Sequence, residues 1–463
     1  MGMRPFRAYD IRGIYGEDVT PELAYKIGLS LRDVVSGEIA VGRDTRPSGE
    51  PLKAALTSGI LASGCNAYDL GMAPTPALYF SVVHENLTGG VVVTASHNPP
   101  EYNGFKVVGR RALSLSYETG LSRMEALIAS GRLPSVDWRG VGTYKWLDWK
   151  EGYLERLLRD IKVERGLSVV VDVGNGAGGV IEDAFTRLGI KVRCLFKEPD
   201  GRFPNHIPDP LREETLEVLR DEVIREGADM GIALDGDCDR VGFVDERGRP
   251  VGGDAAMMIF ARDVLSRSPG AELVVNVLAS KATSDYISEL GGKVRMVRVG
   301  HSYIMSELMS SGALMAGELS GHFYFSDRYL AFDDGIYAAL RMAEIVSRSN
   351  LRLSEVVDSL PAYFTSPEFR VRCDENLKPL IMEALGKEIL RLGLRTVNID
   401  GIRLEADDGW AIVRPSNTEP VLVLRFEGIT RRSLQRIKGE MVDMLKRASS
   451  EVGVSLDLSS LVL

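Results

Sequence analysis

The sequence predicts an α/β protein built from three related α/β domains with mixed sheets, followed by a C-terminal α+β domain. Two observations support this prediction. A pattern of buried strand, helix, glycine and second strand occurs three times, and the last quarter of the chain follows a different pattern. The length of 463 residues also exceeds one ordinary domain and favours about three or more.

Each of the three repeats begins with a short aliphatic run and ends its helix at a glycine. The runs are residues 39–41, 169–171 and 273–275, the glycines are Gly64, Gly189 and Gly291, and the second strands follow at once. Short aliphatic runs are typical of buried strands, and a glycine after a helical stretch is typical of a helix C-terminus. The repeats therefore predict three units of the same kind.

The last quarter predicts a helix, a group of strands and a final helix. We expect a helix at about residues 375–392, strands near 396–404, 410–414 and 421–426, and then the final helix. The final helix places apolar side chains at helical spacing, and we assign them to the core: Leu434, Ile437, Met441, Met444 and Leu445.

Turns that contain glycine or proline separate these blocks near Tyr144, Arg249 and Pro361. The predicted domains are therefore residues 1–144, 145–249, 250–361 and 362–463. Within the first of them, we expect Arg43 and Asp44 to form a structural pair.

The composition, with 44% hydrophobic and 26% charged residues, is that of a soluble globular enzyme, and we expect a cytoplasmic location from the two absences that follow. No apolar stretch approaches the ~20 residues that a membrane span requires, and no secretory segment is apparent at the N-terminus. The net charge of −9 argues against bulk nucleic-acid binding. Four scattered cysteines without CxxC spacing indicate neither a zinc site nor a disulfide framework.

Three carboxylates alternate along residues 235–240, which we call the acid loop. Asp235, Asp237 and Asp239 lie between two apolar runs, residues 230–234 and 241–244, and Arg240 follows. Hard oxygen ligands at this density suit Mg²⁺ or Ca²⁺ better than zinc, and Mg²⁺ usually keeps positions open for water or a phosphate. The acid loop therefore predicts a metal site that handles phosphate.

An EF-hand and a solvated acidic turn are the alternatives for the acid loop. An EF-hand requires glycine at the sixth position, which is Arg240 here, and it requires helices where this chain has strand-like runs. The solvated turn remains open on the residues alone.

A second motif, residues 94–100 or the serine loop, follows the buried-strand run 91–93. It places Ser96 at the carboxyl end of a strand, next to His97, on a segment that two prolines stiffen. An ordinary turn is the simple alternative. A serine hydrolase is disfavoured because no Gly-x-Ser-x-Gly motif surrounds Ser96 and the chain neighbour His97 is poorly placed to act as its base.

The chain resembles the alpha-D-phosphohexomutases, and within them the phosphomannomutase/phosphoglucomutase branch. The resemblance rests on four motifs in the family's order: the serine loop, the acid loop, the sugar loop (residues 317–322) and the phosphate loop (residues 414–420). The opening residues 6–13 are also similar. The resemblance implies four domains around a central cleft, each of which contributes one loop.

The resemblance also implies roles for individual residues. Ser96 would carry the phosphoryl group and, with Asp235, Asp237 and Asp239, would ligate the metal. The other catalytic candidates are Arg240, Lys106, His97, Arg12 and Tyr9, and the substrate-binding candidates are Glu318, Ser320, His322, Arg414, Ser416, Asn417 and Thr418. Tyr9, Lys106 and His322 are the candidates for moving the hydroxyl proton, and the sequence does not choose among them.

The implied reaction is reversible phosphoryl transfer between O1 and O6 of a hexose phosphate. Its cofactors would be Mg²⁺ and glucose 1,6-bisphosphate or mannose 1,6-bisphosphate, and its partners would be hexose 1-phosphates and 6-phosphates, with neither nucleic acid nor membrane. Phosphoglucosamine mutase is the second reading, but Tyr9, Leu319 and Asn417 favour the hexose branch. The sequence leaves the oligomeric state open.

Two further classes of protein compete with a mutase. Residues 174–179 match the Gly-x-Gly-x-x-Gly fingerprint of a nicotinamide dehydrogenase, with Glu198 downstream, although an isolated fingerprint is a weak signal. A tight turn between strand and helix is the simpler reading of these glycines. A sugar-phosphate binding protein is the other competitor, and it would need no metal loop facing a serine.

Overall fold

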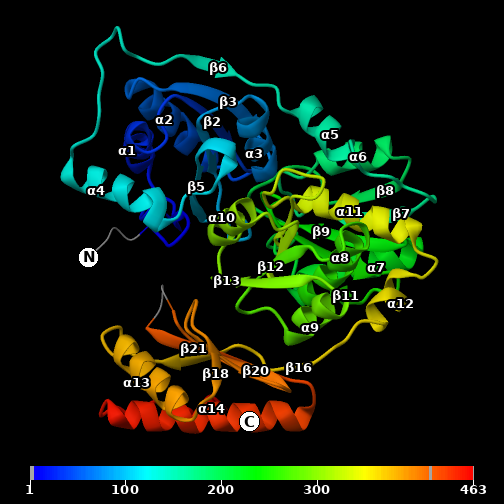
Figure 1. The fold of residues 1–463 in the computed structure, drawn as a ribbon. Coiled ribbons are helices and arrows are strands. Elements are labelled where there is room, and N and C mark those ends of the chain that lie inside the picture. The colour runs from blue at the N-terminus through cyan, green and yellow to red at the C-terminus, as the bar shows by residue number, and fades with distance from the viewer. Residues whose placement is uncertain (1–4, 417–419, 462–463) are drawn as a thin grey trace. The chain divides into compact units, whose positions relative to one another are not determined.

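The computed structural model describes residues 5–416 and 420–461, which form two compact units. Unit 1 contains the chain up to residue 273 and residues 300–359. Unit 2 contains residues 274–299 and the chain from residue 360 onward. Figure 1 labels the elements of both units.

The first sheet of unit 1 is mixed and has the strand order β1-β5-β4-β2-β3-β6. Its strands are β1 (Ile11–Ile14), β2 (Glu38–Arg43), β3 (Asn66–Met72), β4 (Gly89–Val93), β5 (Tyr102–Val108) and β6 (Tyr144–Trp146). Its helices are α1 (Pro21–Ser30), α2 (Gly49–Ala62), α3 (Thr75–His84) and α4 (Ser122–Ser130). β2 lies parallel to β3 and β4, whereas β5 lies antiparallel to β1 and β4. The carboxyl end of β4 therefore leads into the serine loop, and β5 returns beside it.

The second sheet of unit 1 has the order β11-β10-β9-β7-β8 and is also mixed. Its strands are β7 (Ser168–Asp172), β8 (Lys191–Leu195), β9 (Met230–Leu234), β10 (Val241–Asp245) and β11 (Pro250–Val251), and its helices are α5 (Lys150–Leu158), α6 (Val180–Arg187) and α7 (Glu217–Glu226). β9 and β10 pair antiparallel, with Leu234 opposite Val241. The acid loop is therefore the connection of a hairpin between two fully buried strands.

The rest of unit 1 carries the sugar loop. It contains α8 (Gly253–Arg267), α10 (His301–Ser311), β14 (Met315–Gly317), β15 (Phe323–Phe325), α11 (Gly335–Arg348) and α12 (Leu353–Asp358). β14 and β15 pair antiparallel with Gly317 opposite Phe323, so the sugar loop is a short hairpin connection.

Unit 2 joins the third repeat to the C-terminal quarter. Its elements are β12 (Glu272–Asn276), α9 (Lys281–Glu289), β13 (Lys293–Val297), β16 (Phe364–Thr365), β17 (Phe369–Arg372), α13 (Lys378–Arg391), β18 (Arg395–Val397), β19 (Ile402–Ala406), β20 (Gly409–Pro415), β21 (Val421–Gly428) and α14 (Arg431–Glu451). The buried Arg403 donates hydrogen bonds to the carbonyls of Val277 and Ala279, and Glu427 accepts one from the Lys281 N–H. Figure 1 shows α13 and α14 side by side against the antiparallel sheet, where they share one apolar core.

The three repeats have the predicted local structure. β2, β7 and β12 each lead through a helix to β3, β8 and β13. The glycines Gly64, Gly189 and Gly291 have φ of 87°, 72° and 77°, a left-handed conformation that costs other residues free energy. The assignment of α14 to the core is also confirmed, because Ile437, Met441, Met444 and Leu445 are buried and Leu434 packs against the same cluster.

Two expectations for the last quarter were wrong in detail. The single strand expected at 396–404 is two antiparallel strands, β18 and β19, because Gly401 turns the chain between them at φ 84°. The helix expected from about residue 375 begins at Lys378, where Pro379 occupies its first turn, as proline commonly does. The three predicted boundaries between the four domains stay a prediction.

No helix among residues 5–416 and 420–461 is both long and apolar enough to cross a membrane.

Candidate active site

The acid loop brings its three aspartates together in the interior of unit 1. Asp235, Asp237 and Asp239 are each at most 1% exposed, and one carboxylate oxygen from each lies within 4.8 Å of the others. Other segments hold the backbone of the loop. The N–H groups of Thr75, Ala177 and Gly335 donate to the carbonyls of Asp237, Gly236 and Cys238 at 2.8, 3.0 and 2.9 Å. A solvated acidic turn would be exposed, so that alternative is wrong.

Ser96 lies against the acid loop. Its hydroxyl donates a hydrogen bond to the Asp235 carboxylate at 2.5 Å, and its Oγ lies 3.1 Å from His97 Nδ1. His97 is therefore within reach of the hydroxyl, contrary to the expectation that a chain neighbour would be poorly placed. Burial, together with Arg240 and Arg12, lowers the pKa of His97 to about 2, so its ring is neutral.

Lys106 on β5 faces two of the three aspartates. Its ammonium group donates to Asp237 at 2.7 Å and also pairs with Asp239. Burial alone would lower the pKa of Lys106, but Asp237 and Asp239 raise it well above its usual range, so the side chain is charged. For the same reason Lys106, with His322 and Arg240, holds the pKa of Asp239 well below its usual range although burial opposes this.

The aspartates keep oxygen atoms free for a metal ion. Asp237 Oδ1 and Asp239 Oδ1 are buried and have no hydrogen-bond partner among the described residues. Buried polar atoms normally have a partner, so unpaired carboxylate oxygens in one cluster fit the ligand set of a hard divalent cation. The residues of the acid loop thus fit the metal that the sequence predicts.

Arg240 connects the acid loop to the sugar loop. Its Nε donates to His322 Nε2 at 3.0 Å, and the opposite ring nitrogen of His322 lies 2.9 Å from Asp333. Glu318, 6% exposed, accepts the Gly300 N–H at 3.4 Å. Ser320 lies half-buried in the same hairpin turn. The structure therefore brings the predicted sugar loop beside the predicted metal loop.

Arg12 and Tyr9 complete the group of predicted residues in unit 1. Arg12 pairs with Asp10 at 2.6 Å and donates to the Asn98 side chain of the serine loop at 2.7 Å. The Tyr9 ring meets His301 edge to face with centroids 5.3 Å apart. Burial and the neighbouring Asp10 raise the pKa of Tyr9, so its phenol keeps its proton at neutral pH.

The phosphate loop belongs to unit 2. Arg414 on β20 pairs with Asp400 at 2.9 Å, and its buried Nε has no partner among the described residues. The Ser416 N–H donates to the Val421 carbonyl, and Lys378 donates to the Ser416 carbonyl at 2.7 Å. The other two predicted residues of this loop, Asn417 and Thr418, lie outside the described residues.

Sequence reasoning missed four residues that contact the predicted site. Thr75 at the start of α3 donates its hydroxyl to Asp237 at 2.7 Å, and the His301 ring packs between Tyr9 and His322. Asp333 lies against His322, and Arg46 lies beneath the serine loop. Of these four residues, only His301 could have been noticed in the sequence, because the chain has just 5 histidines and each one is a candidate for a functional role.

The expected pair of Arg43 and Asp44 is present only through the backbone, because the Arg43 guanidinium donates to the Asp44 carbonyl oxygen at 2.8 Å. The Asp44 carboxylate instead accepts hydrogen bonds from the side chain and the N–H of Arg46, whereas Arg43 reaches Glu50. The Arg43 side chain is partly exposed, whereas Arg46 is fully buried and needs a counter-charge.

The glycine fingerprint at residues 174–179 packs against the acid loop. A Cβ on Gly176 would lie 2.8 Å from the Gly236 carbonyl oxygen, and one on Gly178 would lie 2.9 Å from Cys238 Sγ. These glycines therefore allow close packing of two loops, as the turn reading predicts. A dinucleotide phosphate would need the space that the acid loop fills.

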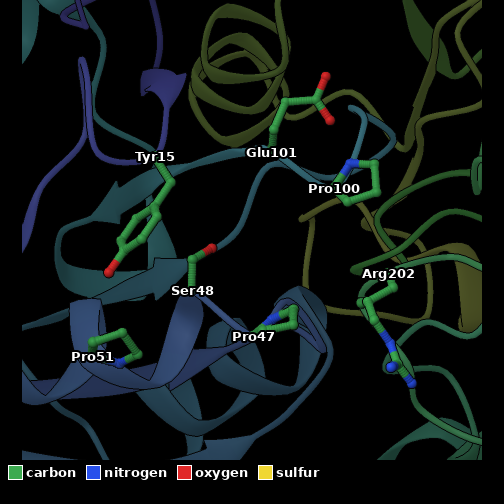
Figure 2. Close-up of a pocket in the computed structure, with 8 residues that line it drawn as sticks. Tyr15, Pro47, Ser48, Pro51, Pro100, Glu101 and Arg202 are labelled. Atoms are coloured by element: carbon green, nitrogen blue, oxygen red, sulfur yellow. The ribbon is translucent and has the colours of Figure 1, made fainter.

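A pocket of about 440 Å³ is lined at one side by Pro100 of the serine loop. Figure 2 shows its lining residues, which include Pro47, Ser48, Pro51, Pro100 and Arg202. None of the predicted catalytic or substrate-binding residues lines it. We therefore do not assign the substrate to this pocket.

Comparison with known proteins agrees with this geometry. Families described as phosphoglucomutase/phosphomannomutase alpha/beta/alpha domains I, II and III and C-terminal domain match residues 3–132, 151–248, 252–364 and 368–444, respectively. The predicted fold class of three α/β domains and a distinct C-terminal domain is thereby confirmed.

Individual relatives cover nearly the whole chain. A phosphomannomutase/phosphoglucomutase from Pseudomonas aeruginosa is 41% identical over 455 residues, 97% of each chain. A probable phosphoglucosamine mutase from Pyrococcus abyssi is 37% identical over 96% of this chain and 99% of its own. A crystal structure of a phosphoglucomutase/phosphomannomutase family protein from Burkholderia thailandensis has a TM-score of 0.90 and 36% identity, covering 98% and 99% of the two chains. With all four domains matched and relatives of about 40% identity along its length, this chain belongs to the phosphoglucomutase/phosphomannomutase family of enzymes.

Proposed function

We propose that this enzyme transfers a phosphoryl group reversibly between O1 and O6 of hexose phosphates, through phospho-Ser96 and a hexose 1,6-bisphosphate. The observation that supports this most directly is the 2.5 Å hydrogen bond from the Ser96 hydroxyl to Asp235, within a buried cluster of three carboxylates that also pairs with the buried Lys106. A sugar-phosphate binding protein has no need for such a cluster.

In the first half of the reaction, phospho-Ser96 donates to the free hydroxyl of a hexose monophosphate. The bond from phosphorus to Ser96 Oγ breaks, a bond from phosphorus to the sugar oxygen forms, and the hydroxyl proton leaves to a base. Of the three candidates for moving that proton, Tyr9 keeps its own proton and Lys106 is charged, so the base in this direction would be His322. The bisphosphate then reverses its orientation, and its other phosphoryl group returns to Ser96.

Charge neutralisation is the main requirement of this chemistry. A phosphoserine adds about −1.5 to −2 charge beside three aspartates. Lys106 pairs with Asp237, the Arg240 charge acts on Asp239 and Asp235, and Arg12 is tied to the serine loop through Asn98. Mg²⁺ bound by Ser96, Asp235, Asp237 and Asp239 would supply the remaining positive charge on the reacting phosphate.

Substrate recognition is proposed to use the sugar and phosphate loops. Glu318 and Ser320 would bind sugar hydroxyls, with His322 beside them, and Arg414, Ser416, Asn417 and Thr418 would hold the phosphate that does not react. A guanidinium suits that task because its planar fork matches phosphate oxygens. Glucose and mannose differ only at C2, so we expect the enzyme to use both. We also propose the four domains given above and a cytoplasmic location.

A second candidate function is phosphoglucosamine mutase, because the relative from Pyrococcus abyssi carries that name. Leu319 and Asn417 favour hexoses. A coupled assay that compares mannose, glucose and glucosamine 1-phosphates separates the two candidates, since turnover of glucosamine 1-phosphate above both hexose phosphates would overturn the first.

The phosphoserine is tested with Ser96→Ala. We expect ³²P from labelled glucose 1,6-bisphosphate to enter the wild-type enzyme at one phosphate per chain and Ser96→Ala at none, and mutase turnover to be lost with it. Ser81→Ala is the matched control, because Ser81 is equally buried in the same domain but bonds only within α3. Equal labelling of wild type and Ser96→Ala would refute the assignment.

A further inference from the structure

Arg46 lies under the serine loop, and its guanidinium uses every donor that it has. Nε donates to Asp44, one terminal nitrogen donates to the carbonyls of Pro99 and Tyr102, and the other donates to the carbonyls of Ser96 and Asn98. These five bonds have lengths of 2.5–3.1 Å and match the five N–H groups of an arginine side chain. The side chain is 0% exposed.

The segment that Arg46 holds cannot be held by a sheet. Pro99 and Pro100 have no N–H, and residues 96–101 lie between β4 and β5, outside both strands. Ser96 itself has φ of 49°, a left-handed conformation that is unfavourable for any residue except glycine. Without this guanidinium the buried Ser96 carbonyl would lose the hydrogen bond from Arg46, as would the partly buried carbonyls of Asn98 and Tyr102, and an unpaired buried polar group costs free energy.

A second set of hydrogen bonds ties Arg46 to the Ser96 amide. Asp44, 0% exposed, accepts from Arg46 and from the Thr94 hydroxyl at 2.8 Å, and Thr94 in turn accepts the Ser96 N–H at 2.9 Å. Both polar groups of the Ser96 backbone are thus fixed through the same ion pair.

Close packing by Phe203 and Gly201 keeps Arg46 in this position. The Phe203 ring centroid lies 5.0 Å from the guanidinium carbon, and a Cβ on Gly201 would lie 2.3 Å from Arg46 Cα. On the other side of Ser96, a Cβ on Gly236 would lie 2.8 Å from the Ser96 carbonyl oxygen. The Ser96 peptide is therefore enclosed between the acid loop and Arg46.

We infer that Arg46 is a positioning residue that sets the backbone of Ser96 so that its hydroxyl oxygen meets the acid loop. This inference rests on the proposed function, because it assigns Arg46 a purpose only if Ser96 carries the phosphoryl group. The hydrogen bonds of Arg46 go to Asp44 and to backbone carbonyls, and its charge also acts on Asp237 of the acid loop, so a substitution that keeps the charge isolates the effect of these hydrogen bonds.

The test is Arg46→Lys, which keeps the charge but offers three donors for five acceptors. We expect kcat to fall about 100-fold, the loss that a displacement of about 1 Å produces. The KM for hexose phosphates should stay within about 3-fold, because uniform substrate binding is unaffected. The rate of ³²P transfer from glucose 1,6-bisphosphate to Ser96 should fall with kcat.

Arg341→Lys is the matched control, because Arg341 is also 0% exposed and pairs with Asp263 and Asp327 in unit 1 without contact to the serine loop. Both variants should lose thermal stability, and only Arg46→Lys should lose phosphoryl transfer. Equal kinetic losses in the two variants, or wild-type kcat in Arg46→Lys, would overturn the inference.

If Arg46→Lys does not fold, the kcat values of Thr94→Val and Thr94→Ser test the inference instead. The valine variant, which leaves the Ser96 N–H without its acceptor, should show the same loss of kcat, and the serine variant should recover it. Wild-type kcat in both would overturn the inference. A wild-type enzyme that neither turns over nor accepts ³²P would instead refute the proposed function.

Discussion

Replacing Lys106 with methionine should make the stability of the enzyme depend on a divalent cation. Lys106 is 5% exposed and forms ion pairs with both Asp237 and Asp239. Methionine fills a similar volume but removes the ammonium group that pairs with both buried carboxylates. Removing one partner of a buried ion pair typically costs about 3–5 kcal/mol. At roughly 2–4 °C per kcal/mol for a large domain, we expect Tm in EDTA to fall by about 6–20 °C.

Added Mg²⁺ should restore much of this loss, because the cation occupies the cluster that Lys106 has left. A metal at 100 times its Kd stabilises the folded state by about 2.7 kcal/mol. The assay is thermal unfolding followed by circular dichroism, in EDTA and in excess MgCl₂. The rise in Tm on adding Mg²⁺ should be larger for Lys106→Met than for wild type, in which the ammonium group competes with the metal.

Lys53→Met is the control for this experiment. Lys53 Nζ lies 2.7 Å from Asp69 in the same domain and is similarly buried, but it does not contact the acid loop. This variant should lose stability that Mg²⁺ does not restore. If Mg²⁺ raises the Tm of both variants equally, or of neither, the acid loop is not the metal site that we propose.

Two predictions concern other parts of the molecule. Arg414→Ala should weaken binding of both hexose 1-phosphate and 6-phosphate by about 1.5–3 kcal/mol, the usual value of a hydrogen bond to a charged group, and should increase the requirement for added glucose 1,6-bisphosphate. Titration calorimetry against Arg395→Ala, an exposed arginine of the same sheet, checks this, and unchanged binding would contradict it. His206 lies 2.9 Å from Asp172, which raises its pKa although burial opposes the shift. A raised pKa means that this pair stabilises the fold fully below the unfolded pKa of about 6.5 and that the contribution is lost as pH rises through the folded pKa. The difference in free energy of unfolding between wild type and His206→Gln should therefore shrink from pH 6 towards pH 9, and a difference independent of pH would exclude the pair.

The sequence predicted those features of the fold that depend on neighbours along the chain. The aliphatic runs and the left-handed glycines Gly64, Gly189 and Gly291 are local signals, and each one marked its element correctly. The single strand expected at 396–404 failed because Gly401 was read as part of a strand, although an Asp-Gly pair is a common turn.

The site was predicted through motifs and missed where contacts are distant in sequence. Ser96 and the acid loop each carry a recognisable pattern, and the structure brings them together. Arg46 carries no pattern, because its four carbonyl partners are 50 or more residues away and a carbonyl is common to all residues. Asp44 was paired with its chain neighbour Arg43 for the same reason, since burial decides the partner and the sequence does not show burial directly.

The close approach of Gly236 to the serine loop limits how the acid loop could be used in protein engineering. Its four charged residues resemble a portable metal-binding motif, yet its backbone carbonyls depend on Thr75, Ala177 and Gly335, which belong to three separate segments. If the acid-loop sequence were placed in another hairpin, its carbonyls would lack these N–H donors and the segment would relax into an ordinary turn. A designer who wants this chemistry on a new scaffold would have to transfer the surrounding loops together with it, because the conformation belongs to the assembly and not to the short peptide.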